Sequence, residues 1–169
     1  MQGGMRMSDP RKYAKSTDDL PQIEEILSMS GLEFMLAVKE GRYPGPPIGK
    51  TMGFWPTLVE DGKVIFTGTP TFDVMNPIGT VHGGWYGTIL DSCMACAIQT
   101  KVPKGSTYTT LEYKVNIIRP IPIGTRVEAI GTVHHAGRST GISDGEIRGA
   151  EDGKLYATGS TTCIIMKMK

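Results

Sequence analysis

The sequence predicts an α+β fold in which an antiparallel β-sheet is wrapped around one long helix. Six segments after position 50 are rich in Thr, Val, Ile and aromatic residues, as strands are. One helical segment, residues 84–100, follows the second of them. Because strands and helices do not alternate, the order β-β-α-β-β-β-β argues against a parallel sheet. The tetrapeptide Glu-Asp-Gly-Lys, at 60–63 and again at 151–154, predicts two hairpins.

The chain divides into three parts. Residues 1–17 are polar and without periodic pattern, and we expect a flexible tail. Residues 18–49 place apolar side chains at helical spacings and end in the segment RYPGPPIG, which predicts a helical extension followed by a Pro/Gly loop. This loop is expected to stop any helix and to form a wall. Residues 50–169 hold the predicted strands and the long helix.

The composition excludes several classes of function. The 18 basic and 17 acidic residues are spread along the chain, so no basic stripe favours nucleic acid. The longest apolar run is too short for a membrane helix, and the N-terminus lacks the apolar core of a signal peptide. Three cysteines, an odd number, argue against a disulfide framework and for a reducing compartment. We therefore expect a cytoplasmic protein that binds neither membrane nor nucleic acid.

The predicted central helix has no broad charged face. Between Asp73 and Lys101, Asp91 is the one formally charged side chain. A helix that is apolar all round is buried all round, so a partner must cover the side that the sheet leaves open, and we expect a dimer or higher oligomer. A carboxylate in such a helix costs stability unless it is paired or used. Asp91 is therefore either a hydrogen-bonded structural group or a catalytic one.

The segment NPIGTVHGGWYGTILD resembles the signature of the hot-dog-fold thioesterases of the PaaI type. The similarity extends from about Gly53 to the end of the chain and includes EYKVNIIRPI, GRS and DGKLYATGSTTCIIM. The resemblance implies that residues 50–169 form a hot-dog thioesterase domain. It also implies a homodimer or a dimer of dimers that hydrolyses acyl-CoA thioesters without a metal or other cofactor.

The chemistry of hydrolysis agrees with these residues. A thioester needs a donor on its carbonyl oxygen and a carboxylate that activates water or attacks directly. The backbone N–H of Gly83, together with that of Gly84, is an unpaired donor at a helix start, where the helix dipole is positive. Asp91 lies eight residues further on, about 12 Å along the helix. One chain therefore cannot bring both groups to one carbonyl, whereas two antiparallel helices in a dimer could.

The resemblance implies roles for further residues. Asn76 would orient or bind the water or the carbonyl, and His82 would hold the loop or contact the thioester region. Thr110 would position water, with Thr109 left open as the alternative.

Three more residues match places where related proteins contact the pantetheine arm or the nucleotide of CoA. These residues are Arg119, Arg138 and Ser139.

Several competing interpretations follow from the same residues. A non-catalytic acyl-CoA-binding protein and a hot-dog dehydratase are the alternatives to a thioesterase. The pair Cys93 and Cys96 has the C-x-x-C spacing of zinc sites, but no second ligand pair exists, so we interpret both as small core residues. GRSTG, residues 137–141, fits G-x-S-x-G but lacks a following histidine and the strand-to-helix elbow of serine hydrolases. The aromatic side chains and the Pro-rich loop suggest aryl or medium-chain acyl groups.

Overall fold

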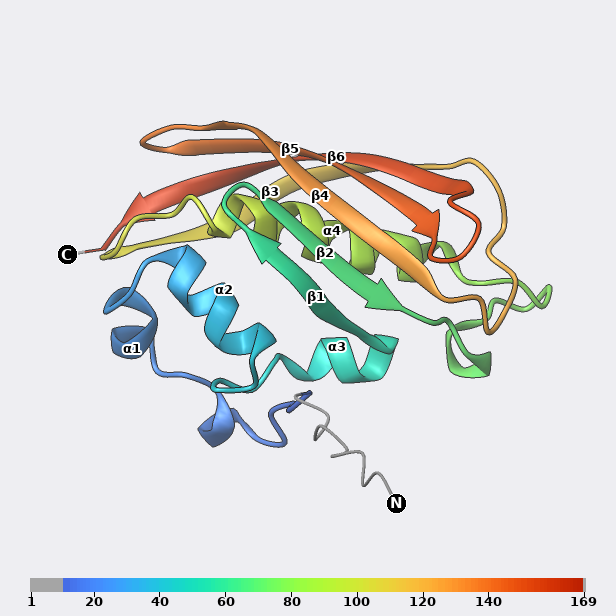
Figure 1. The fold of residues 1–169 in the computed structure, drawn as a ribbon, viewed down its shortest axis with the longest axis horizontal. Helices are drawn as coiled ribbons and strands as arrows, with labels where there is room; N and C mark the ends of the chain where they lie inside the picture. The colour runs from blue at the N-terminus through green and yellow to red at the C-terminus, as the bar shows by residue number, and fades with distance from the viewer. Residues whose placement is uncertain (1–10, 169) are drawn as a thin grey trace, which may run out of the picture.

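The computed structural model describes residues 11–168, so most of the predicted N-terminal tail lies outside the described residues. The predicted α+β hot-dog fold is confirmed: a sheet wraps around one long helix, α4 (Gly83–Gln99) (Figure 1). The strands are β1 (Phe54–Glu60), β2 (Lys63–Gly68), β3 (Ser106–Ile117), β4 (Val127–Ala136), β5 (Thr140–Gly149) and β6 (Leu155–Lys167). Among the described residues, no helix is both long and apolar enough to cross a membrane.

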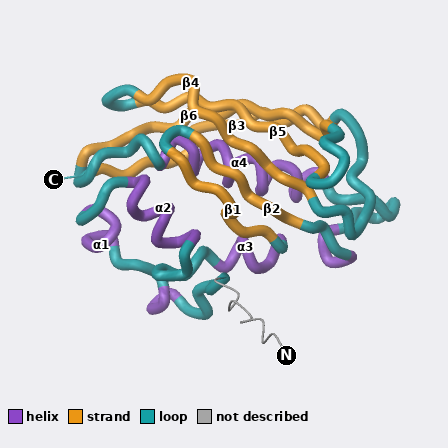
Figure 2. The backbone as a smooth tube through the Cα atoms, viewed as in Figure 1, coloured by secondary structure: helices purple, strands orange, loops and turns teal. Residues whose placement is uncertain are grey.

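The six strands form one sheet in the order β1-β2-β4-β5-β6-β3, and every neighbouring pair is antiparallel. The chain crosses from β2 to the far edge through α4, so β3 lies at one edge and β1 at the other (Figure 2). Both predicted hairpins are present, β1–β2 and β5–β6, with Gly62 and Gly153 at φ of 81° and 66°. Glycine is favoured at both turns because a side chain rarely adopts positive φ.

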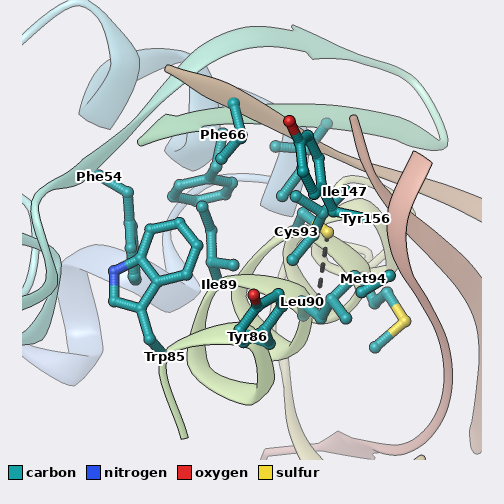
Figure 3. Packing of buried hydrophobic residues seen from close by; sticks show 14 of the residues in the cluster. Phe54, Phe66, Trp85, Tyr86, Ile89, Leu90, Cys93, Met94, Ile147 and Tyr156 are labelled. Atoms are coloured by element: carbon teal, nitrogen blue, oxygen red, sulfur yellow. Dashed lines mark hydrogen bonds between the residues drawn. The ribbon is translucent and has the colours of Figure 1, made fainter. Parts of the chain in front are cut away.

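The core lies between α4 and the concave face of the sheet. Figure 3 shows Trp85, Ile89 and Leu90 of α4 among side chains of the strands. Two buried aromatic residues of the helix also have polar partners: Trp85 Nε1 donates to the Met52 carbonyl at 2.8 Å, and the Tyr86 hydroxyl accepts from the Ile121 N–H at 2.8 Å. These two aromatics therefore anchor α4 to the segments that flank the sheet.

The N-terminal extension consists of a short 3₁₀ turn and three helices. After η1 (Thr17–Asp19) come α1 (Ile23–Leu27), α2 (Gly31–Lys39) and α3 (Pro47–Met52). Ser30 caps α2 by accepting from the Glu33 N–H, and the Glu33 carboxylate accepts in return from the Ser30 N–H. Figure 1 shows that α2 and α3 cover β1, the edge strand opposite β3.

The expectation that RYPGPPIG stops any helix is wrong at its end, because α3 begins at Pro47. Proline suits the first position of a helix, where its missing N–H would have no partner. Gly53, at φ of 73°, ends α3 in the left-handed conformation. The first half of the segment remains a loop, as predicted.

A close approach of α4 to β4 gives one prediction for stability. Gly131 lies directly against the helix, and an added Cβ would collide with the Cys93 carbonyl oxygen. Because backbone cannot yield as a flexible side chain can, we expect Gly131→Ala to lower the free energy of unfolding by about 3 kcal/mol. Denaturant unfolding checks this value. A midpoint equal to that of the wild type would show that α4 and β4 are not packed this closely.

Candidate active site

The start of α4 is held by a histidine cap. His82 is the N-cap residue, and its Nδ1 accepts from the Gly84 N–H at 2.9 Å. Because Nδ1 accepts in this bond, it is not the ring nitrogen that carries the proton. The bond also engages the backbone N–H of Gly84, which the sequence analysis considered as a second donor to the thioester oxygen. Within the described residues the N–H of Gly83 makes no hydrogen bond, so Gly83 is the donor that remains for a ligand.

The loop before α4 is ordered by Asn76. Its Oδ1 accepts from the backbone N–H groups of Ile78 and Thr80, both at 3.1 Å, and its Nδ2 donates to Thr80 Oγ1 at 2.7 Å. This is the turn that asparagine side chains commonly form. Both ends of the amide are thus engaged inside the loop. Asn76 fixes the path of the chain that leads to Gly83.

Three of the predicted site residues line one hollow. Asn76, Gly83 and Arg119 surround a space of about 350 Å³ at the N-terminal end of α4. Its walls include Ile117 and Ile118, which end β3 and follow it. The hollow therefore combines a free backbone donor, a cation and apolar side chains at the positive end of a helix.

Asp91 lies further along α4, facing β3. Its Oδ1 accepts from Thr110 Oγ1 at 3.0 Å. Burial raises the pKa of the Asp91 carboxyl above its ordinary value, and the Thr110 hydrogen bond opposes that rise. No cation pairs with Asp91 among the ion pairs of the described residues. A half-desolvated carboxylate with one hydroxyl partner is suited to act as a base or a nucleophile.

Thr110, and not Thr109, contacts Asp91, and a β-bulge follows Thr110 in β3. The register of β3 against β6 shifts between Thr110 and Glu112. Before the shift, Thr110 points toward α4; after it, Tyr113 does, since its ring lies beside Gly87. The bulge thus changes which alternate residues of β3 face the helix, and bulges often lie beside active sites. The segment TTLEYK contains no glycine, so the sequence does not indicate a bulge there.

The structure separates the remaining predicted residues. Arg138 and Ser139 lie in the β4–β5 turn, and the start of β5 packs near the C-terminal end of α4, where Gly141 is next to Ile98. They are therefore at the opposite end of the helix from Gly83 (Figure 1). The segment GRSTG is a hairpin, so the serine-hydrolase elbow is absent, as expected.

Residues 78–156, which span α4, β3, β4 and β5, match the family model of the thioesterase superfamily. This segment of the chain is thus similar to the thioesterase superfamily. A Caenorhabditis elegans protein whose name proposes an esterase activity is 30% identical over 108 residues, which is 64% of this chain and 63% of that protein. This chain thus spans less than two thirds of that relative. The acyl-coenzyme A thioesterase PaaI of Escherichia coli is 26% identical over 62% of this chain and 73% of its own length.

Solved structures have the same fold as this chain. A phenylacetic acid degradation-related protein from Ralstonia eutropha is 27% identical and superposes with a TM-score of 0.70, covering 78% of this chain and 98% of that one. The recognition of a PaaI-like hot-dog protein from NPIGTVHGGWYGTILD is therefore confirmed. Asn76 lies just outside the matched residues, whereas Gly83, Asp91 and Thr110 lie inside them.

Proposed function

We propose that this protein hydrolyses acyl-CoA thioesters to the free acid and CoA. The observation that carries the proposal is the pair of reactive groups on α4: a backbone donor at Gly83 with no acceptor and a half-buried carboxylate at Asp91 held by Thr110. The match to the thioesterase superfamily supports the same reaction class. A polar group without sufficient hydrogen-bond partners lowers the stability of the fold when it is buried, and neither the Gly83 N–H nor the Asp91 carboxylate has partners that fully offset this loss.

The proposed site is composed of two chains. Gly83 and Asp91 are about 12 Å apart along one rigid helix, which is too far for both to act on one carbonyl. The edge strand β3 offers the surface for a second chain, since Leu111, Tyr113 and Ile117 are 61%, 48% and 50% exposed. Such apolar exposure at the open edge of a sheet marks an interface. In a homodimer with antiparallel helices, Asp91 of one chain would face Gly83 of the other.

In this arrangement the thioester oxygen accepts a hydrogen bond from Gly83, and negative charge that develops there is stabilised by the helix dipole. Asp91 either takes a proton from water, whose oxygen adds to the carbonyl carbon, or adds to that carbon itself. In both routes the carbon–sulfur bond breaks, CoA leaves as a thiolate that takes up a proton, and water supplies the oxygen of the acid. His82 keeps the Gly83 backbone in place by capping α4.

The CoA moiety is assigned to the surface near both helix ends. Arg119 lines the hollow beside Gly83, where its charge suits a phosphate. Arg138 and Ser139 lie near the C-terminal end of α4, remote from Gly83 of the same chain. In a dimer with antiparallel helices, this end of one α4 would lie on the side of Gly83 of the other chain. A dimer of dimers is compatible with the same interface.

A panel of acyl-CoA thioesters tests the proposal. We expect the wild-type protein to release thiol from at least one of acetyl-, butyryl-, octanoyl-, palmitoyl-, benzoyl- and phenylacetyl-CoA, and to elute as a dimer or tetramer in light scattering. Binding of these esters without release of thiol on any member would reject hydrolysis. That result would favour an acyl-CoA-binding protein.

The hydrogen bond from Thr110 gives a prediction for pH dependence. Because this bond favours the charged form of Asp91, its removal in Thr110→Val raises the carboxyl pKa further. The acidic limb of the kcat profile should therefore move to higher pH by about one unit. Thr109→Val, on the exposed side of the same strand, is the matched control and should leave the limb in place. Equal shifts in both variants would contradict the assignment of Thr110.

A further inference from the structure

A second cavity lies between the N-terminal extension and the hot-dog domain. Its volume is about 370 Å³, within the range of roughly 300–1,000 Å³ that small-molecule pockets have. None of its lining residues carries a charge at neutral pH. Most of them precede residue 78, where the match to the thioesterase superfamily begins.

Three parts of the extension form one side of the cavity. Ile26 comes from α1, Phe34 and Val38 come from α2, and the loop 44–46 closes the side as the predicted proline-rich wall. The opposite side consists of aromatic side chains of the sheet, Phe54, Trp55 and Phe66. Figure 1 shows α2 beside β1, with α1 on the far side of α2.

The cavity is held open by rigid contacts. The Trp55 ring stands edge-on to Tyr13 with centroids 5.1 Å apart, and its Nε1 donates to the Lys39 carbonyl at 3.4 Å. The Tyr13 hydroxyl donates to the Phe54 carbonyl at 3.0 Å. Gly45 lies so close to the Trp55 ring that an added Cβ would be 2.7 Å from it. The aromatic wall is therefore pre-formed, which lowers the entropy cost of binding.

The inner end of the cavity reaches the candidate active site. Ser92, the residue after Asp91 on α4, lines it, and so does Tyr108 of β3. Tyr108 precedes Thr110 by two positions, so both side chains point to the same face of the strand, toward α4. Cys96 lines the cavity one turn beyond Ser92. Burial raises the pKa of both Cys96 and Tyr108, and the charge of nearby Asp91 adds to that rise.

We propose that this cavity binds the acyl group of the substrate and selects neutral aryl or medium-chain acyl groups. The inference rests on the proposed thioester hydrolysis. An apolar chain that enters past Ser92 would place its carbonyl beside Asp91 and remove apolar surface from water at roughly 25 cal/mol per Å². An acyl group with a terminal carboxylate is disfavoured, because no lining side chain could pair with its charge.

Two substitutions on α1 test the proposal. Ile26→Trp places a bulky ring in the cavity from a short surface helix, so the hot-dog core is untouched. Ile23→Trp, on the same helix, is the matched control, since Ile23 is 44% exposed and does not line the cavity. We expect Ile26→Trp to lower kcat/KM for octanoyl- and phenylacetyl-CoA about 10-fold or more, but that for acetyl-CoA less than about 3-fold. Ile23→Trp should change neither.

An equal loss on all three substrates, or no loss in Ile26→Trp, would overturn the proposal. Binding of non-hydrolysable thioethers separates this inference from the proposed function. The wild type should bind S-octyl-CoA at least about 10-fold more tightly than S-methyl-CoA in calorimetry, and Ile26→Trp should abolish the difference. This result would support the acyl cavity even if no ester were hydrolysed. Equal affinity of the wild type for both thioethers would reject the cavity even if hydrolysis were observed.

Discussion

Asp91→Asn is expected to lower kcat about 10³-fold with all acyl-CoA esters, while the oligomer remains intact. Asparagine has nearly the same shape and can still accept the hydrogen bond from Thr110, but it can neither take a proton from water nor form an anhydride with the acyl group. Steady-state release of thiol, followed together with light scattering, measures both quantities. A variant that keeps more than a tenth of wild-type kcat would remove Asp91 from the mechanism.

The same variant should unfold at a higher temperature than the wild type at pH 7. Burial raises the pKa of Asp91 in the folded state, so the folded protein binds this proton more tightly than the unfolded one. Stability is therefore lost as pH rises from the unfolded pKa through the folded one, so the wild type carries this cost at pH 7. Asparagine does not carry this cost. The two midpoints should converge near pH 3, where Asp91 is protonated in both states.

A lower midpoint for Asp91→Asn at pH 7 would instead identify Asp91 as a structural carboxylate. This comparison needs no substrate, so it separates the catalytic from the structural interpretation independently of the acyl group. A catalytic group that costs stability is a common compromise at active sites.

Gly83→Pro is expected to lower kcat about 10² to 10³-fold, the usual loss when one oxyanion donor is removed. Proline deletes the N–H of Gly83 and suits the first position of a helix. The preceding residue, His82, already has the extended conformation that a following proline requires, with ψ of 139°. The substitution therefore removes the donor with little disturbance of α4, and the effect should appear in kcat more than in KM.

Gly83→Ala is the matched control for the loss of the donor. It keeps the N–H, and its Cβ would lie 3.7 Å from Ile117 Cδ1, an ordinary contact. We expect it to lose far less activity than Gly83→Pro. If alanine and proline reduced kcat equally, the bulk of the side chain and not the backbone N–H would be responsible, and the proposed role of Gly83 would be wrong.

The periodicity and turn signals of the sequence were sufficient for much of the fold. The Asp-Gly pairs located both hairpins, and the run of small and apolar residues located α4 to within one residue at each end. The isolated charge in that run singled out Asp91. These features are local, so one segment carries all the information that they need.

The features that sequence could not predict depend on contacts between distant segments. The bulge after Thr110 arises from the pairing of β3 with β6 and has no glycine to mark it. Helix α3 was not predicted because proline both ends and begins helices, and the proline-rich segment was interpreted only as an end. Of the two tryptophans of the chain, Trp85 is buried in the core and Trp55 lines the cavity. Only the packing of the extension against β1 distinguishes the two.

A heterodimer of two inactive variants tests the two-chain site most directly. Asp91→Asn and Gly83→Pro chains, co-expressed with different tags and purified for both, should pair so that one site has an intact Gly83 and an intact Asp91. The other site then carries both substitutions. We expect about half of the wild-type kcat per dimer, although each homodimer is almost inactive. Activity no higher than that of the two homodimers would contradict it, because Gly83 and Asp91 would then have to act within one chain.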